Sequence, residues 1–177
     1  MTTLIKHKRV EFSELFYDLV FVFAISKATT LIDHLHNGIL TWNSFLDFFM
    51  AVLVLTDSWM IQTVYTNRYG KNSLFNIVIM FIKMGLLLFI ANMMGPDWQQ
   101  YFHYLCWAIG TLTLTLFLQY LVEFFRKSTD NVERESIKGF LWITGLGSLG
   151  VYLAALLPIY VGVYILYASI LLTFIMP

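Results

Sequence analysis

Charged residues are scarce in this chain of 177 residues: only 12% are Asp, Glu, Lys or Arg, where a soluble domain has roughly 25%. Residues of the apolar set make up 59% of the chain, and 18% are aromatic. So few charges exclude a water-soluble globule, and a mean hydropathy of +0.72 with this aromatic content excludes a nucleic-acid-binding chain, which needs a strongly basic composition. The formal net charge of zero adds nothing about partners. The composition therefore predicts a membrane protein with the lipid bilayer as its partner.

Several kinds of chemical motif are also missing. The single cysteine, Cys106, excludes an internal disulfide and a multi-cysteine metal site. The sequence has no Ser-His-Asp set, no His-Glu-x-x-His pair and no phosphate-binding loop, so we expect no enzyme, no cofactor and no metal. Gly145-x-Gly147-x-x-Gly150 spells a dinucleotide fingerprint, but it lies in an apolar run. We therefore expect these glycines to let another helix approach closely.

Long apolar stretches are what the sequence does contain, and they predict an all-α, polytopic membrane helix bundle. An α-helix needs about 20 residues to cross the hydrocarbon layer. Pro158 divides the last apolar stretch, which is too long for one span, and predicts a tight hairpin there. The six predicted spans are Leu15–Ile32, Phe45–Tyr65, Leu74–Met94, Tyr101–Phe125, Phe140–Leu157 and Ile159–Met176.

Lysine and arginine predict the orientation, because loops rich in these residues stay in the cytoplasm. Nine of the 11 basic residues fall in alternate loops. They are Lys6, Lys8 and Arg9 before the first span, Arg68 and Lys71 after the second, and Arg126, Lys127, Arg134 and Lys138 after the fourth. We predict a cytoplasmic N-terminus, a location in the inner or plasma membrane, and a solvated cytoplasmic loop over Lys127–Ser136.

The sequence ends at Pro177, directly after an apolar span. We expect residues 1–177 to form a single transmembrane domain that is the N-terminal half of a longer protein. Its predicted partners are that C-terminal half or a second copy in a homo-oligomer.

Two stretches resemble a known family. Residues 14–24 read ELFYDLVFVFA and residues 59–69 read WMIQTVYTNRY. Both are similar to motifs of the low temperature requirement protein A (LtrA) family, which usually has Phe in place of Tyr17 and an acidic run in place of Gly70 and Lys71. The recognisable motifs cover Val10 to Gly70. The resemblance implies a multi-pass membrane protein named for a growth requirement in the cold.

Ionisable residues within the spans are the candidate functional residues, since a charge in the bilayer is costly and usually faces the bundle interior. Glu11, Glu14 and Asp18 share one face of the first helix, and Asp18 lies about 6 Å deeper than Glu14. Asp57 and Lys83 are predicted at similar depths on consecutive helices, roughly 12 and 14 Å from the interface. We expect Lys83 to pair with Asp57, with Asp18, or with both.

Two further charges have different expected surroundings. Lys27 lies about 180° from Asp18 around the helix, so it belongs to another face. It is expected either to meet Asp47 at the outer end of the second span or to extend toward the interface along its own stem. Glu123 is expected to form an interfacial salt bridge with Arg126 or Lys127.

These charges leave two main functions open. One is a transporter or channel for a proton or small ion, with a path along Asp18, Asp57, Lys83, Glu14 and Lys27. The other is a structural or assembly protein, in which buried polar groups fix the register of the helices. A membrane enzyme is a weaker third interpretation.

Overall fold

The computed structural model describes residues 11–33, 41–70, 73–95, 97–126 and 131–175. These residues form six α-helices and two short 3₁₀ segments, and no strand occurs among them, which confirms the predicted all-α fold. The helices are α1 (Phe12–Ala28), α2 (Trp42–Tyr69), α3 (Leu74–Met93), α4 (Phe102–Arg126), α5 (Asn131–Leu156) and α6 (Ile159–Ile175). The 3₁₀ segments are η1 (Thr29–Leu31) and η2 (Trp98–Tyr101).

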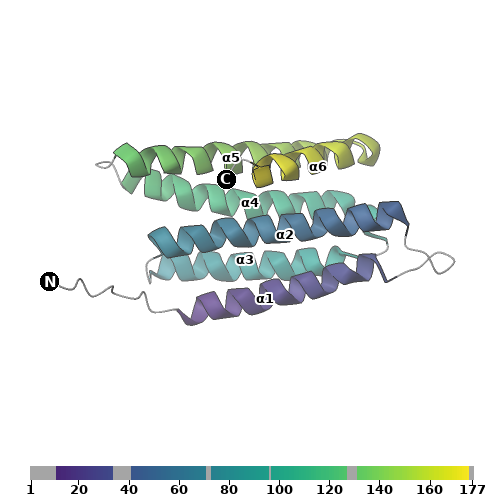
Figure 1. The fold of residues 1–177 in the computed structure, drawn as a ribbon, viewed down its shortest axis with the longest axis horizontal. Coiled ribbons are helices and arrows are strands. Elements are labelled where there is room, and N and C mark those ends of the chain that lie inside the picture. The colour runs from purple at the N-terminus through teal and green to yellow at the C-terminus, as the bar shows by residue number, and fades with distance from the viewer. Residues whose placement is uncertain (1–10, 34–40, 71–72, 96, 127–130, 176–177) are drawn as a thin grey trace.

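The helices run up and down along one long axis (Figure 1). Helix α1 packs on α3, α3 on α4 and α4 on α5, while α6 folds back along α5 after a turn at Pro158. Helix α2 lies among these groups and contacts α1, α4 and α6. Polar residues at different angles around α2 therefore face different neighbours.

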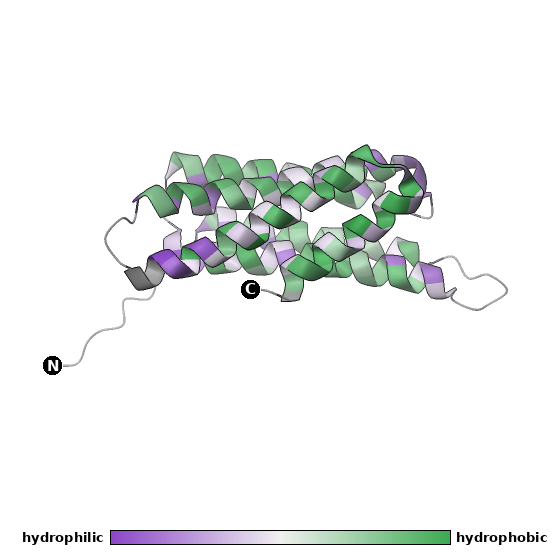
Figure 2. Ribbon diagram, turned by 90° about the horizontal axis from the view of Figure 1, so that it is seen from above, coloured by the Kyte–Doolittle hydropathy of each residue, from purple (hydrophilic) through white to green (hydrophobic). Residues whose placement is uncertain are grey.

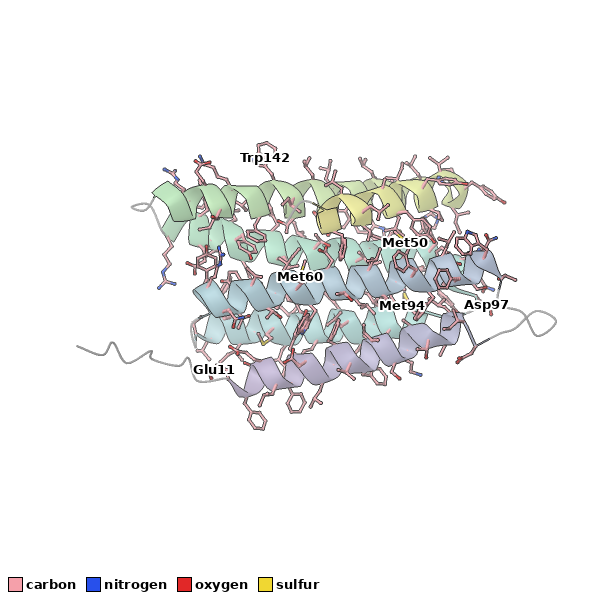
Figure 3. The ribbon with its side chains drawn as sticks, in the orientation of Figure 1. Glu11, Met50, Met60, Met94, Asp97 and Trp142 are labelled. Carbon is pink, nitrogen blue, oxygen red and sulfur yellow. The ribbon has the colours of Figure 1, made fainter. Side chains whose placement is uncertain are left out.

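Helix length and surface composition fit a membrane environment. Four helical stretches are long and apolar enough to cross a bilayer: Trp42–Tyr69, Leu74–Met93, Trp98–Arg126 and Arg134–Leu156. Hydrophobic residues cover most of the length of the bundle (Figure 2). Trp142 is 69% exposed and points away from the bundle (Figure 3), as expected for a side chain in contact with lipid. The chain is therefore described as a multi-pass membrane protein.

Helices α1 and α6 are shorter, with 17 residues each. That length corresponds to roughly 25 Å, at the lower limit for a membrane-spanning helix. Helix α6 is strongly apolar, whereas α1 contains Glu14, Asp18 and Lys27. All six predicted helices exist, and that α1 and α6 also cross the membrane stays a prediction.

Several of the described basic residues lie at one end of the bundle. Arg68 lies in the last turn of α2, Arg126 ends α4, and Lys138 lies near the start of α5. Because the helices alternate in direction, these positions share the end at which α1 begins (Figure 1). Glu11 lies near that end and Asp97 at the opposite one (Figure 3). Lys6, Lys8, Arg9, Lys71 and Lys127 lie outside the described residues.

One predicted boundary is wrong. Helix α5 begins at Asn131 rather than at Phe140, so much of the expected cytoplasmic loop is helical. Lys138 Nζ forms an ion pair with Glu135 Oε1 at 2.5 Å, one turn away on this part of the helix. The hydropathy pattern marked where the apolar part of the helix begins, whereas the helix itself extends beyond it.

Candidate functional site

Lys83 joins three helices in the interior of the bundle. The side chain on α3 is 0% exposed, and its Nζ donates hydrogen bonds to Oε1 of Gln62 on α2 and to Oε1 of Gln119 on α4. Gln62 Nε2 in turn donates to Thr66 Oγ1 at 2.9 Å. The two amide side chains are themselves buried, with 3% and 1% exposure. We call Lys83, Gln62 and Gln119 the lysine clamp.

The predicted ion pair between Lys83 and an aspartate is not found. Neither Asp18 nor Asp57 lies within salt-bridge distance of Lys83, although all three residues are among those described. Asp57 and Lys83 are both buried and lie on consecutive helices, but rotation separates their surroundings. Asp57 precedes Gln62 by five residues, which turns it about 140° away from the residue that Lys83 contacts.

Asp57 lies on the other side of α2, against a small cavity between α2, α4, α5 and α6. The residue is 7% exposed, and its Oδ1 has no hydrogen-bond partner among the described residues. The cavity has a volume of about 20 Å³. Its polar lining consists of Asp57 and four hydroxyl side chains, namely Ser58, Thr113, Ser169 and Thr173. We call this set the Asp57 site.

The hydroxyl groups of this site are arranged as acceptors. Thr113 Oγ1 donates to the Ile109 carbonyl at 3.0 Å, and Ser169 Oγ donates to the Ile165 carbonyl at 2.7 Å. Thr173 Oγ1 donates to the Ile170 carbonyl at 2.8 Å. Because the hydroxyl hydrogens of these three residues are used within their own helices, their oxygen lone pairs remain for another donor or a cation. Ser58 Oγ, the fourth hydroxyl, has no hydrogen-bond partner among the described residues.

Glycines on α5 allow α6 to come close enough to form this site. A Cβ at Gly147 would collide with Thr173, and a Cβ at Gly150 would collide with Ser169. Both of these α6 side chains line the Asp57 cavity. The expectation that the glycines of the fingerprint permit close helix packing is therefore confirmed for Gly147 and Gly150.

A second carboxylate, which is partly exposed, lies toward the opposite end of α2. Asp47 accepts hydrogen bonds from Trp98 Nε1 at 3.0 Å and from Tyr167 Oη at 2.6 Å. These donors come from η2 and α6, so the carboxylate ties three parts of the chain together. The predicted alternative of a Lys27–Asp47 pair is not found. Lys27 Nζ instead lies 5.8 Å from the centre of the Phe23 ring on its own helix.

Three cavities follow one another along α2. An open pocket of about 450 Å³ is lined by Asp47, Trp98 and Tyr167, and these residues also line a narrower cavity of about 40 Å³. Met50 and Met94, labelled in Figure 3, are further walls of the narrower cavity. The narrower cavity shares the lining residues Val54, Ile109 and Ile170 with the Asp57 cavity. An apolar constriction thus separates the two aspartates.

Comparison with known proteins assigns the chain to a family. Residues 9–177 match the model of the bacterial low temperature requirement A protein (LtrA). The chain belongs to the LtrA family. No curated protein and no solved structure matches it. The LtrA match extends well beyond the motifs within Val10–Gly70 and covers the lysine clamp and the Asp57 site.

The two motif stretches of this LtrA chain meet in the structure. Trp59 Nε1 donates a hydrogen bond to Asp18 Oδ1 at 2.8 Å, and the Trp59 ring stacks on Phe21 at 5.3 Å between centroids. Asp18 itself is exposed at the side of the bundle, and Glu14 is partly exposed. Asp18 therefore lies apart from both Asp57 and Lys83, because α1 turns its Tyr17 rather than its Asp18 toward the core.

Tyr17 occupies the position at which the LtrA resemblance implies phenylalanine. Its side chain is 3% exposed, and its hydroxyl has no hydrogen-bond partner among the described residues. A buried site that offers the hydroxyl no partner suits a phenylalanine ring.

Sequence reasoning found the buried charges of this LtrA protein but missed most of their partners. Gln62 and Gln119 are polar residues within apolar spans, a signal that can be read from sequence. The hydroxyl residues of the Asp57 site come from three helices, and nothing in their spacing brings them together. The salt bridge predicted for Glu123 is confirmed with Arg126, at 3.7 Å between Oε1 and Nη1.

Proposed function

We propose that this LtrA-family protein moves a proton or a small monovalent cation across the cell membrane, with Asp57 as the group that binds it. The observation that carries the proposal is the unpartnered Asp57 Oδ1 beside a cavity lined by hydroxyl oxygens. A buried carboxylate oxygen without a partner is costly. A bound proton or cation relieves that cost.

The size and lining of the Asp57 site favour a small ion. A cavity of about 20 Å³ is large enough for one water-sized species. Carboxylate and hydroxyl oxygens are hard ligands that suit a proton or an alkali cation. The cavities along α2 supply a route from the Asp47 end, and the Val54, Ile109 and Ile170 constriction has to open for passage.

Within this proposal, the other predicted path residues have secondary roles. Lys83 is held by two amide oxygens and positions α2 and α4 beside α3. Asp18, Glu14 and Lys27 lie toward the surface of the bundle, outside the described cavities along α2.

The lysine clamp also favours a second function, that of a structural or assembly protein without flux. Its polar atoms are satisfied by each other, as expected for groups that fix helix register. This alternative requires no ion at Asp57.

Purified protein reconstituted in liposomes tests the proposal. We expect the wild type to dissipate a proton, sodium or potassium gradient, Asp57→Asn to lose this flux, and Asp57→Glu to keep part of it. Asn is nearly isosteric with Asp but carries no charge, which makes it the sharpest single change. Wild-type liposomes that stay silent to all three gradients would reject transport and favour the structural role.

We also propose that the end of the bundle with Arg68 and Arg126 faces the cytoplasm. Single cysteines at Asp97 and Asn131, in a Cys106→Ala background, report on the two ends. An impermeant thiol reagent added to sealed cells is expected to label position 97 and not position 131. Labelling at position 131 alone would reverse the orientation.

A further inference from the structure

The open pocket at the Asp47 end of the bundle has an aromatic lining. It lies between the N-terminal parts of α2 and α6 and the segment η2, and its volume is about 450 Å³. Trp98, Tyr160, Tyr164 and Tyr167 supply four aromatic side chains, and the described residues that line the pocket include no lysine or arginine. Volumes of this order suit a small organic molecule rather than a bare metal ion.

Asp47 gives this pocket a negative charge that the described residues around it leave uncompensated. Its two hydrogen-bond donors, the Trp98 indole and the Tyr167 hydroxyl, are neutral. Lys27, the basic residue that the sequence placed nearest, is directed over Phe23 instead. No described cation forms an ion pair with Asp47. The two hydrogen bonds fix the carboxylate in place without cancelling its charge.

The combination of a fixed carboxylate and aromatic walls selects one ligand chemistry. Aromatic ring faces attract cations, most strongly where the cation is weakly hydrated, and a carboxylate adds direct charge attraction. An anion would be repelled by Asp47, and a neutral apolar molecule would leave the carboxylate unpaired. Organic ammonium groups with methyl substituents satisfy both features at once.

We propose that this pocket binds an organic ammonium ion, of which the trimethylammonium group of choline is the model. The site includes Asp47, Trp98 and the α6 tyrosines and does not include Asp57. It therefore does not depend on the proposed ion flux.

The same chemistry has two sources, a free solute and the headgroup of a phospholipid. The pocket lies at one end of the helices, where lipid headgroups are also found. A free ligand competes from solution, whereas a headgroup acts only when its lipid is present in the bilayer.

Binding of choline and tetramethylammonium to the purified full chain tests the proposal by calorimetry in phosphatidylglycerol nanodiscs. We expect saturable binding of both cations and no binding of 3,3-dimethyl-1-butanol, which has nearly the shape of choline without its charge. Asp47→Asn is expected to weaken binding at least about tenfold, because it removes the charge and keeps the side-chain shape.

Tyr164→Leu supplies a second variant in case Asp47→Asn fails to fold, because Tyr164 is 76% exposed and makes little contribution to the core. We expect it to weaken binding about threefold to tenfold. Tyr104→Leu is the matched control: Tyr104 is an exposed tyrosine of α4 outside the pocket, and its loss should leave binding unchanged.

Nanodiscs of phosphatidylcholine separate the two sources. Loss of choline binding in these discs, restored in phosphatidylglycerol, identifies the lipid headgroup as an occupant. Equal binding in both kinds of disc identifies a free solute.

Three outcomes would overturn the proposal: equal binding of choline and its neutral analogue, no binding of either cation, or equal binding by the Asp47, Tyr164 and Tyr104 variants. The Asp57→Asn variant should bind choline normally even where it has lost flux, which keeps the two proposals separable.

Discussion

Lys83 and Asp57 are both buried ionisable residues on neighbouring helices, but their surroundings are opposite. Lys83 donates to two amide oxygens from two other helices, whereas Asp57 Oδ1 has no partner among the described residues. A buried charge with hydrogen-bond partners can hold helices in register. A buried charge without them is a cost that a scaffold does not need. We therefore propose a structural role for the lysine clamp and a functional role for the Asp57 site.

The largest expected effect comes from breaking the lysine clamp. Lys83→Met leaves the side-chain oxygens of Gln62 and Gln119 buried without a donor, and we expect a loss of about 2–4 kcal/mol in the free energy of unfolding. Thermal unfolding in detergent, followed by size-exclusion chromatography, measures the loss.

Rescue experiments then test which partners Lys83 has. Changing Gln62 and Gln119 to Leu in the Lys83→Met background removes the orphaned oxygens and should recover part of the stability. Asp57→Asn should recover nothing, because Asp57 does not contact Lys83. Rescue by Asp57→Asn would instead support the Lys83–Asp57 ion pair predicted from the sequence.

A smaller effect is expected from a methyl group placed at the Asp57 site. Gly147→Ala pushes on Thr173 and should cost about 1–3 kcal/mol by separating α5 from α6. Gly85→Ala on α3 is the control, because a Cβ there meets no atom within 4 Å. Thermal unfolding should separate the two variants, and equal stability would show that close α5–α6 packing does not form the site.

Asp57→Asn should alter stability in the direction opposite to Lys83→Met. The variant removes a buried charge whose Oδ1 has no partner among the described residues, and it adds an amide that can donate to the hydroxyl oxygens lining the cavity. We therefore expect the free energy of unfolding to rise by about 1 kcal/mol, measured by the same thermal assay. A clear loss of stability would mean that the Asp57 carboxylate has structural partners and is not kept for function.

The smallest effect is expected at Tyr17, which also carries a buried hydroxyl without a partner among the described residues. Tyr17→Phe restores the residue implied by the LtrA resemblance and should change stability by about 0.5 kcal/mol or less. We expect flux to be retained, since the Tyr17 hydroxyl does not line the Asp57 cavity. Loss of flux in folded Tyr17→Phe would extend the functional site to α1.

Sequence predicted the helices well because hydropathy reports the apolar length of each one. The start of α5 was missed, since the polar segment around Glu135 is helical without being apolar. Lys83 and Asp57 were found because charges are conspicuous in apolar runs. Their partners were not found. The position of a residue in the sequence gives its depth along the helix, but it does not show which helix the side chain faces. Tyr167 and Asp47 are 120 residues apart, and only the fold brings them together.

Ion flux per folded molecule in Asp57→Asn and Asp18→Asn is the most direct test of the functional assignment of Asp57. Both substitutions remove one carboxylate, but Asp18 bonds to Trp59 at the side of the bundle and Asp57 lines the interior cavity. We expect flux to vanish in Asp57→Asn and to stay near the wild-type rate in Asp18→Asn. Wild-type flux in Asp57→Asn, or its loss only in Asp18→Asn, would contradict the assignment.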